Sequence, residues 1–553
     1  MRPLPFTRSQ ILGRYQTVLR VFSRYGFGSL IEHVGLAGLA RTASAQAEPR
    51  AGRGERLRRA FEELGPAYVK LGQMLSTRGD ILPPDIVAAL ERLQDQVSPF
   101  AYDQVLSALE AELGAPLERH FQSIEPVPVA AASLGQVHEA VLTDGRPVVI
   151  KVQRPGVREQ VDLDLQVLEG LARLAARRTG WGRSYDLPGV AREFGAMLRG
   201  ELDYRQEGQN AERFAAAFAD EPAIRFPGVC WEQTTGRVLT LERVGGLRIT
   251  DREGMRQRSI APAHVAQRLA GAIFRMVLRE GFFHADPHPG NLFVGTDGGI
   301  IFVDMGMVGE LTPAMRENII DYVIGVVAKD TDLVVEAILR MGIISRPADM
   351  AGLRRDCDRL RQKYGEVPIR EVQLGPALRE TLVMARKYQI SFPSGYTVLL
   401  KALTTLEAVC RQVDPDATLV GLAAPYAELV MATKLKPERI LERVGRELLD
   451  AGRHTLRIPR QVSRLLAAVE EGEWKLALDH TGLEPALNRL SAIANRLAIA
   501  ILLASLIIGT ALVSSSSGSQ SFLHRYPVAD VGFILIAAVG LWLILSILGS
   551  RRS

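Results

Sequence analysis

The chain has 553 residues, of which 47% are hydrophobic, so it can supply two or three structural units and membrane segments besides. Its 67 basic residues are balanced by 62 acidic ones, and no long basic block interleaved with aromatic residues occurs, which argues against nucleic acid as a partner. The three distant cysteines, Cys230, Cys357 and Cys410, lack the CxxC spacing of zinc or redox sites and fit a reducing compartment.

The first 40 residues predict a basic amphipathic helix. Five arginines precede the first acidic residue, and apolar residues recur at helical spacing: Arg2, Arg8, Arg14, Arg20 and Arg24, with Ile11, Tyr15, Val18, Leu19 and Phe22. Such a helix either lies on an anionic membrane surface or packs its apolar face on the main domain. Charges interrupt the apolar run, unlike in a signal peptide, while an organelle transit segment is a further alternative. Residues 41–58 predict a linker because they are rich in Ala, Gly, Arg and Ser.

Two strands are expected at residues 136–142 and 147–153, joined by a hairpin turn in which Gly145 supplies a positive φ. The second strand ends its apolar run Val148-Val149-Ile150 at Lys151. The apolar side chains bury the strand, while the lysine ammonium can reach phosphate oxygens, as the strand lysine of protein kinases does. Kinases carry a glycine-rich loop before this lysine. Here the corresponding residues are Ala130, Ala131, Ala132 and Ser133, which we expect to lie over the nucleotide.

A long helical region is expected after this hairpin, up to about residue 218. It carries three acids that could pair with a lysine: Glu201, Asp203 and Glu207. On one continuous helix Asp203 and Glu207 share a face, and Glu201 points about 120° away from Glu207. The helix could then serve two lysines, or all three acids could be solvated surface. A strand at 237–242 follows, and the step from Glu242 to Gly245-Gly246 predicts a hinge whose main chain would bind adenine.

The most informative stretch is His284-Ala285-Asp286-Pro287-His288-Pro289-Gly290-Asn291, followed by an apolar strand and Asp304-Met305-Gly306. Asp286 would orient or deprotonate the attacking group, while Asn291 and Asp304 would bind Mg²⁺ that bridges the phosphates of ATP. Each feature alone is more often structural than catalytic. Their order along the chain after Lys151 favours a kinase-like nucleotide site. We expect His284 to pack and to form hydrogen bonds rather than to act as a base.

The substrate is not expected to be a protein. Ala285 stands where regulated kinases carry an arginine for an activation-loop phosphate, and the APE-ended segment that forms a peptide platform is missing after Gly306. Near the end of the chain, residues 497–513 and 531–548 are uncharged apolar runs of roughly 17 and 18 residues. They predict a transmembrane helical hairpin. Arginines flank it on the outer sides, which places the catalytic body in the cytoplasm, at the inner membrane of a bacterium.

These features together resemble the UbiB (AarF-type) family of atypical kinases. The resemblance rests on the alanine-rich loop, Lys151 in VVIKVQRPG, the HADPHPGN loop and Asp304, and it extends to further motifs of the family. These are the KxGQ signature Lys70-Leu71-Gly72-Gln73, the ExD motif Glu201-Leu202-Asp203, Phe392-Pro393-Ser394, Leu406-Glu407 and Arg411-Gln412-Val413-Asp414-Pro415. Residues 10–425 and the apolar tail are covered.

The resemblance implies an α+β, bilobal kinase-like fold. It pairs Glu207 with Lys151, as in kinases, and Glu201 and Asp203 with Lys70, so that Lys70 and Gln73 enter the site and regulate it. The expected units are an N-terminal segment, a helical KxGQ extension, the two lobes, a helical linker and the membrane hairpin, at residues 1–58, 59–125, 126–245, 246–425, 426–490 and 491–553.

The function that the resemblance implies is that of a membrane-anchored, Mg²⁺-dependent ATPase or kinase that supports biosynthesis of ubiquinone-type isoprenoid quinones. It would bind ATP and ADP, hydrolyse ATP slowly or phosphorylate a small or lipid molecule, and meet membrane lipid, quinone precursors or quinone biosynthetic enzymes. One alternative is a dedicated lipid or small-molecule kinase. Another is a nucleotide-gated scaffold, without catalysis, for those enzymes.

Overall fold

The computed structural model describes residues 6–29, 52–79, 81–93, 98–114, 116–179, 186–344, 349–365 and 374–423, with Tyr426, Ala504 and Ile508. The chain divides into two compact units, Met1–Arg439 and Ile440–Ser553, and the elements below all belong to the first. Among the described residues, no helix combines the length and the apolar character that a membrane crossing requires. The predicted hairpin at 497–513 and 531–548 and the linker at 426–490 lie outside the described residues, apart from Ala504 and Ile508.

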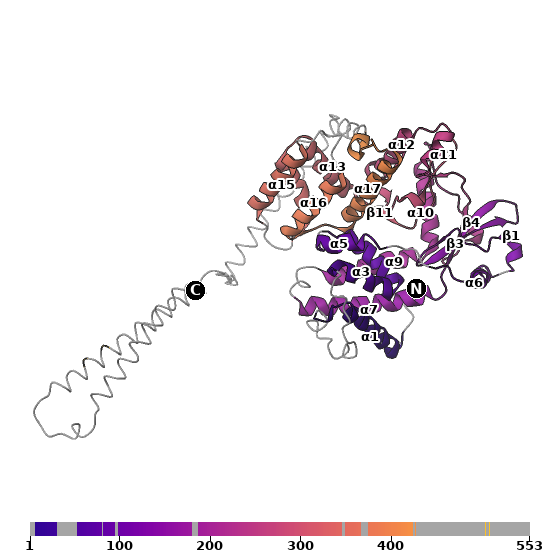
Figure 1. The fold of residues 1–553 in the computed structure, drawn as a ribbon, viewed down its shortest axis with the longest axis horizontal. Coiled ribbons are helices and arrows are strands. Elements are labelled where there is room, and N and C mark those ends of the chain that lie inside the picture. The colour runs from indigo at the N-terminus through magenta and orange to yellow at the C-terminus, as the bar shows by residue number, and fades with distance from the viewer. Residues whose placement is uncertain are drawn as a thin grey trace, which may run out of the picture. The chain divides into compact units, whose positions relative to one another are not determined.

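An antiparallel five-stranded sheet forms the sheet lobe (Figure 1). Its strands are β1 (Phe121–Ile124), β2 (Ala130–Ala131), β3 (Gly135–Leu142), β4 (Pro147–Gln153) and β6 (Val238–Glu242), in the order β1-β3-β4-β6 with β2 on β3. Gly145, with a φ of 87°, makes the predicted turn between β3 and β4. Alternate residues Val148, Ile150 and Val152 are buried in the same core as residues of α6 (Tyr102–Leu113). The sheet thus begins before residue 126, where we expected the lobe to start.

A layer of six helices from the first two hundred residues packs beside the sheet lobe. These helices are α1 (Arg8–Arg24), α3 (Arg53–Leu64), α4 (Pro66–Ser76), α5 (Pro84–Leu90), α7 (Val157–Arg178) and α9 (Leu187–Glu201). The apolar face of α1 is covered by this layer, and Arg14 binds the fully buried Asp164 of α7 at 2.5 Å. Of the alternatives for this helix, the structure therefore shows packing on the main domain.

Two boundaries in this layer differ from the prediction. Residues 53–58, expected to end a linker, form the start of α3, because that helix buries Ala60, Phe61 and Leu64 despite its many charges. The long helical region expected before residue 218 is also interrupted. Helix α9 ends at Glu201 and α10 (Tyr204–Ala217) begins after Asp203, whose carboxylate accepts a hydrogen bond from the Arg205 N–H and caps α10.

The helical lobe carries a small sheet and the catalytic loop region. Its elements are β5 (Ile224–Arg225), β7 (Leu247–Arg248), α11 (Arg252–Gln257), α12 (Pro262–Arg275), the π-helical turn η4 (Met276–Glu280), β8 (Phe282–His284), the 3₁₀ turn η5 (Pro289–Asn291), β9 (Leu292–Val294), β10 (Ile300–Phe302) and β11 (Val308–Glu310). Strands run in the order β5-β10-β9-β7, and β8 pairs separately with β11. Because Leu292 pairs with Phe302 in this hairpin, Asn291 before β9 and Asp304 after β10 lie close together.

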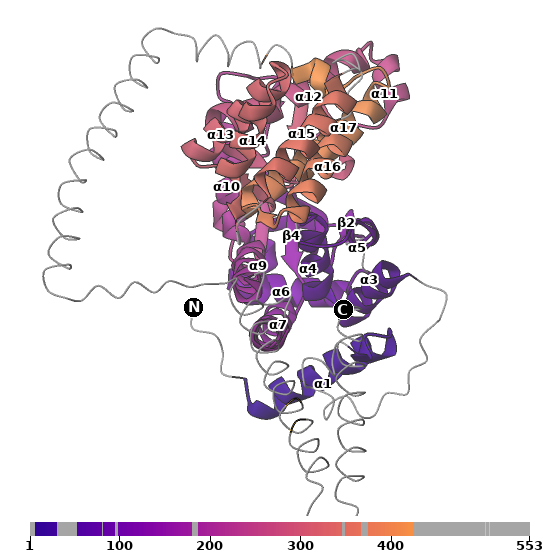
Figure 2. The same ribbon diagram turned by 90° about the vertical axis from the view of Figure 1, so that its left-hand side faces the viewer.

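Helices continue the lobe after β11. They are α13 (Pro313–Val327), α14 (Thr331–Met341), α15 (Met350–Gly365), α16 (Leu374–Lys387) and α17 (Ser394–Val413), with the short strands β12 (Ile343–Ile344) and β13 (Ile390–Ser391). Helix α17 buries Leu399, Ala402 and Leu406 in the same core as α12. Figures 1 and 2 both place α5 of the N-terminal layer near α16 of the helical lobe.

Two short 3₁₀ turns complete the described fold, η2 (Leu117–Arg119) before β1 and η3 (Trp231–Gln233) before β6. The result is mostly helical, with mixed helices and sheets in two lobes, as the sequence predicted for residues up to about 425.

Candidate active site

A cleft of about 2130 Å³ lies between the two lobes. The sheet lobe contributes the alanine-rich loop and Lys151, the helical lobe contributes Asp286, Asn291 and Asp304, and helices α4, α5, α16 and α17 line the rest. Pockets for a single small ligand measure roughly 300–1,000 Å³. The cleft is therefore large enough for a nucleotide and a second molecule.

An ion pair between Lys151 and Glu207 joins β4 to α10. The Lys151 Nζ donates to both carboxylate oxygens of Glu207, at 2.7 and 3.0 Å, and lies 3.8 Å from Asp304 Oδ2. The ammonium also lies 5.2 Å from the centre of the Tyr204 ring. The structure thus brings together the strand lysine and the helix acid that the sequence predicted as partners.

The environment of this pair shifts both pKa values. Burial raises the pKa of Glu207 to about 7, although Lys151 acts in the opposite direction. Burial lowers the pKa of Lys151, but the charges of Asp304 and Glu207 outweigh it and hold that pKa well above its usual value. Lys151 is therefore positively charged at neutral pH and can bind phosphate oxygens.

The catalytic loop follows β8. His284 is fully buried, and both of its ring nitrogens are engaged: Nε2 lies 2.6 Å from the Asp304 carbonyl oxygen, and Nδ1 accepts the Asp286 N–H at 3.1 Å. Burial lowers the pKa of His284, so the ring is neutral and donates from Nε2. This agrees with the packing role we expected. His288 turns back to accept the N–H of Gly290.

Asn291 and Asp304, the two predicted magnesium ligands, both line the cleft. The Asn291 amide donates to the Asp286 carbonyl at 3.4 Å, which leaves Asn291 Oδ1 as a possible ligand. The Asp304 carboxylate accepts the Gly306 N–H at 2.8 Å, and its side chain is 42% exposed toward the cleft. Desolvation raises the pKa of Asp304, but Lys151 and the Gly306 N–H outweigh it and hold this pKa well below its usual range.

This donor set fits Mg²⁺, which binds one or two protein oxygens and completes an octahedron with water and phosphate. Among the described residues, no group of three or more His, Cys, Asp or Glu side chains is placed to hold a metal by itself. A metal at Asn291 and Asp304 would therefore depend on the nucleotide.

The alanine-rich loop forms the roof of the nucleotide region. Ala130 and Ala131 pair with β3 as strand β2, and the Ala132 N–H donates to the Gly135 carbonyl in a tight turn. All three alanines line the cleft. Ser133 was predicted to bind nucleotide as well, but it lies inside the turn, is only 1% exposed and does not line the cleft.

The segment that we predicted as a hinge follows β6. Glu242 lines the cleft, but its N–H donates to the Gly228 carbonyl and that of Arg243 donates to Pro147. Val244 and Gly245 follow on the cleft side. The N–H groups of Glu242 and Arg243 are therefore already bound within the protein.

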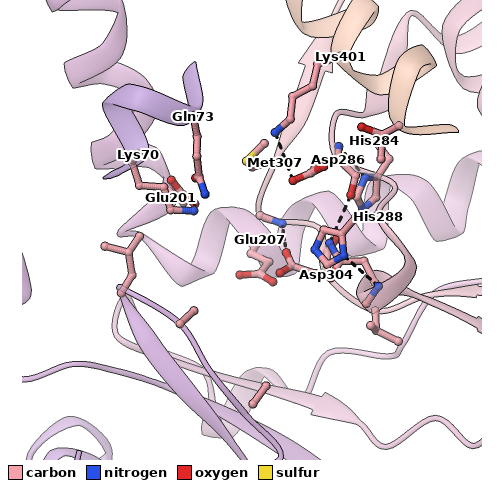
Figure 3. A pocket seen from close by; sticks show the side chains of 18 of the residues that line it. Lys70, Gln73, Glu201, Glu207, His284, Asp286, His288, Asp304, Met307 and Lys401 are labelled. Carbon is pink, nitrogen blue, oxygen red and sulfur yellow. Dashed lines mark hydrogen bonds and ion pairs between the residues drawn. The ribbon is translucent and has the colours of Figure 1, made fainter. Parts of the chain in front are cut away.

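Helix α4 carries the KxGQ segment to the opposite side of the cleft (Figure 3). The Lys70 ammonium forms an ion pair with Glu201 at the end of α9, and Gln73 also lines the cleft. A side chain at Gly72 would come within 2.2 Å of Leu93 and 2.8 Å of Phe61, so glycine lets α4 pack closely. Asp203 was predicted to meet Lys70 with Glu201. In the structure the Asp203 carboxylate accepts the Arg205 N–H and caps α10, which begins after the break that follows Glu201.

Lys401 of α17 is a charged residue of the site that the sequence did not predict. Its side chain points toward Asp286, and its Nζ donates to Asp286 Oδ2 at 3.3 Å (Figure 3). The two residues are 115 positions apart, so spacing offers no signal. The available signal is a lone lysine within the apolar stretch Val398-Leu399-Leu400-Lys401-Ala402-Leu403.

Comparisons with known proteins agree with this architecture. Residues 92–338 match the ABC1 atypical kinase-like domain, residues 357–418 the UbiB helical domain, and residues 481–549 the ABC1/UbiB kinase-like C-terminal domain. The "Probable protein kinase UbiB" of Cellvibrio japonicus is 32% identical over 96% of this chain and 99% of its own. An uncharacterized protein of Synechocystis sp. is 32% identical over 88% of this chain and 83% of its own.

A plant protein is also similar in sequence. The chloroplastic "Protein ACTIVITY OF BC1 COMPLEX KINASE 7" of Arabidopsis thaliana is 35% identical over 76% of this chain and 61% of its own length. The similarity to the Cellvibrio and Synechocystis proteins extends over most of both chains, and the matched domains follow in order. The chain described here belongs to the ABC1/UbiB family of atypical kinase-like proteins.

Proposed function

We propose that this protein is an Mg²⁺-dependent, kinase-like enzyme that hydrolyses ATP slowly or transfers its γ-phosphoryl group to a small or lipid acceptor. The observation that carries the proposal is the arrangement around Asp304. Lys151 pairs with Glu207 and lies 3.8 Å from this carboxylate, while the loop from Asp286 to Asn291 lies beside it. These are the parts that phosphoryl transfer requires.

The residues divide the work by position. Lys151 would hold phosphate oxygens from the sheet lobe, and the alanine-rich loop would cover them. Mg²⁺, held by Asn291 and Asp304, would supply the positive charge that bridges the phosphates. Asp286 would orient the acceptor hydroxyl or water and receive its proton. His284 would hold the loop, because it binds the main chain at both Asp286 and Asp304.

A small or lipid acceptor is favoured over a peptide. Helices α4 and α5 line the cleft on the side where a peptide would dock, and a side chain added at Gly79 after α4 would touch Leu382 on α16. Strand β11 ends at Glu310, and α13 begins at Pro313, which leaves no room for an extended peptide platform. The remaining lining of the cleft between these helices is largely apolar.

We place this activity at a membrane and in isoprenoid quinone biosynthesis. The sequence supports the first part through two uncharged runs at 497–513 and 531–548 with arginines outside them, which would leave the catalytic body in the cytoplasm. Membership in the family of the UbiB relative supports the second part. Quinone precursors, quinone biosynthetic enzymes and membrane lipid are then the expected partners.

A nucleotide-gated scaffold is the second candidate. It is favoured by the ion pair of Lys70 with Glu201, which fixes the KxGQ helix across the cleft and would limit access of any acceptor. Nucleotide binding would then change the lobes without chemistry.

The two candidates separate when labelled γ-phosphate of ATP is followed with the full-length protein in vesicles that contain membrane lipid and a phenolic quinone precursor. Label in inorganic phosphate or in an organic product supports the enzyme. If the protein binds nucleotide but releases γ-phosphate no faster than an Asp286→Asn variant does, the scaffold is supported instead.

A further inference from the structure

The contact between Lys401 and Asp286 is an ion pair of the cleft that neither the kinase motifs nor the KxGQ motif explains. It joins a helix of the C-terminal extension to the catalytic loop at 3.3 Å. Both side chains are 25% exposed, so the pair faces the cleft and is accessible to a ligand. It is therefore not a buried structural pair.

Helix α17 does not need Lys401 for its own packing. The helix is held by Leu399, Ala402 and Leu406, which are buried in the core of the helical lobe. Another face of the same helix lines the cleft, with Thr397, Leu400, Lys401, Thr404 and Ala408. Those positions recur at helical spacing, so a whole stripe of α17 faces the ligand space. Lys401 is the cation on this stripe.

The charges around the cleft fall into a simple pattern. Lys151 pairs with Glu207 and Lys70 pairs with Glu201. Asp304 is the carboxylate proposed to bind the metal. Lys401 is the cation nearest to Asp286, the residue that would receive the acceptor's proton, and thus lies on the side where the γ-phosphoryl group and the acceptor meet.

We propose that Lys401 is a catalytic residue that contacts the γ-phosphoryl group during transfer, an inference that rests on the proposed function. An ammonium carries three N–H donors, so one can hold Asp286 while another binds a phosphoryl oxygen. Lys151 and Mg²⁺ would stabilise charge on the nucleotide side, and Lys401 would do so on the acceptor side.

Lys401 keeps its proton throughout the transfer. The bond from the acceptor oxygen to phosphorus forms while the bond from phosphorus to the bridging oxygen of ADP breaks. The electron pair of the broken bond stays on ADP, and the acceptor's proton passes to Asp286. Lys401 stays protonated and stabilises the negative charge of the oxygens on the transferred group.

The pairing also gives Asp286 a counter-charge before nucleotide binds. When the γ-phosphate arrives, it supplies a second anion for the same ammonium. Lys401 should therefore distinguish ATP from ADP, which Lys151 should do much less because it already pairs with Glu207.

The test compares the full-length wild type with Lys401→Met, Lys401→Arg and a control, Lys387→Met. Lys387 lies on the neighbouring helix α16, outside the cleft, and is an exposed partner of Asp356, which Tyr388 and Arg359 also bind. The affinities for Mg²⁺-ADP and for a non-hydrolysable Mg²⁺-ATP analogue are measured with the thermal unfolding midpoint and kcat. We expect Lys401→Met to bind the ATP analogue about tenfold more weakly, to keep its ADP affinity, and to lose about 10²-fold in kcat.

Lys401→Arg should recover the affinity for the ATP analogue, and Lys387→Met should behave as the wild type. The proposal is overturned if Lys401→Met keeps the wild-type ratio of ATP-analogue to ADP affinity. A fall in kcat with an unchanged ratio would make Lys401 a positioning residue for Asp286. Equal losses for both nucleotides with a lower unfolding midpoint would make it structural. A wild type that binds neither nucleotide would instead refute the proposed function itself.

Discussion

Two lysine–glutamate pairs stand on opposite sides of the cleft, and their comparison explains the design of the site. Lys151 and Glu207 join β4 to α10 within the sheet lobe, whereas Lys70 and Glu201 join the added helix α4 to the end of α9. The two acids are only six residues apart, yet the break at Asp203 sends them to different partners. One lysine–glutamate pair thus helps to form the proposed phosphate site, and the other holds the added helix α4 at the cleft.

The largest effect is expected from breaking the first pair. Lys151→Met removes the phosphate-binding cation and leaves Glu207, only 7% exposed, without its partner. We expect ATP turnover to fall by about 10²- to 10³-fold, because a charge-assisted contact to the transferred phosphates is lost. Steady-state ATPase assays check this. Turnover within threefold of the wild type would show that the pair is structural.

The second pair should behave differently. Lys70→Ala releases α4 from Glu201 and opens the cleft, so basal ATP turnover should change several-fold, upward, while affinity for Mg²⁺-ADP stays the same. Arg24→Ala, which removes an exposed ion pair with Glu63 elsewhere in the helical layer, serves as the control. If Lys70→Ala loses nucleotide affinity as Lys151→Met does, the two pairs have the same role and the distinction between them fails.

The pH dependence sharpens the comparison further. Burial raises the pKa of Glu207 to about 7, so this acid is largely protonated below pH 7 and the pair with Lys151 is lost there. The value of kcat/KM for ATP, which reports the nucleotide-free protein, should therefore rise about tenfold from pH 6 to pH 8. Glu207→Gln should remove this rise. A flat wild-type profile over this range would contradict the assignment.

The smallest effect is expected in the loop above the phosphates. Ala131 of β2 pairs with Gln136 of β3, and a glycine at position 131 would loosen the backbone. Ala131→Gly should shift the ratio of ATP to ADP affinity by a few-fold, with the unfolding midpoint nearly unchanged. Ala108→Gly in α6, away from the cleft, is the matched control for the cost of adding glycine. Identical ratios in all three proteins would mean that the loop only packs.

The sequence predicted most of the site because its residues lie in short local patterns. Lys151 ends a strand, and Asp286 with Asn291 occupies one loop, so their spacing already carries the geometry. The prediction of one helix for Glu201, Asp203 and Glu207 was wrong. Asp203 caps the start of α10, and the spacing of apolar residues does not show whether an aspartate lies inside a helix or caps one.

Other features depended on the tertiary structure alone. The burial of Ser133 follows from the tight turn beneath the loop, and the contact of Lys401 with Asp286 joins segments that only the packing of α17 on α12 brings together. The start of the sheet lobe at β1 was missed for the same reason, because strand pairing with β3 decides it. Local motifs therefore identify the chemistry, while long-range packing determines what else surrounds it.

The central claim is that Asp304 holds a magnesium ion for the nucleotide, and one titration tests it directly. The affinity for ATP is measured with and without Mg²⁺ for the wild type and for Asp304→Asn, after circular dichroism has shown that both are folded. The account predicts that Mg²⁺ strengthens binding to the wild type and that Asp304→Asn loses this gain, by about 3 kcal/mol for one charge-assisted contact. The same Mg²⁺-dependent affinity in both proteins would contradict it.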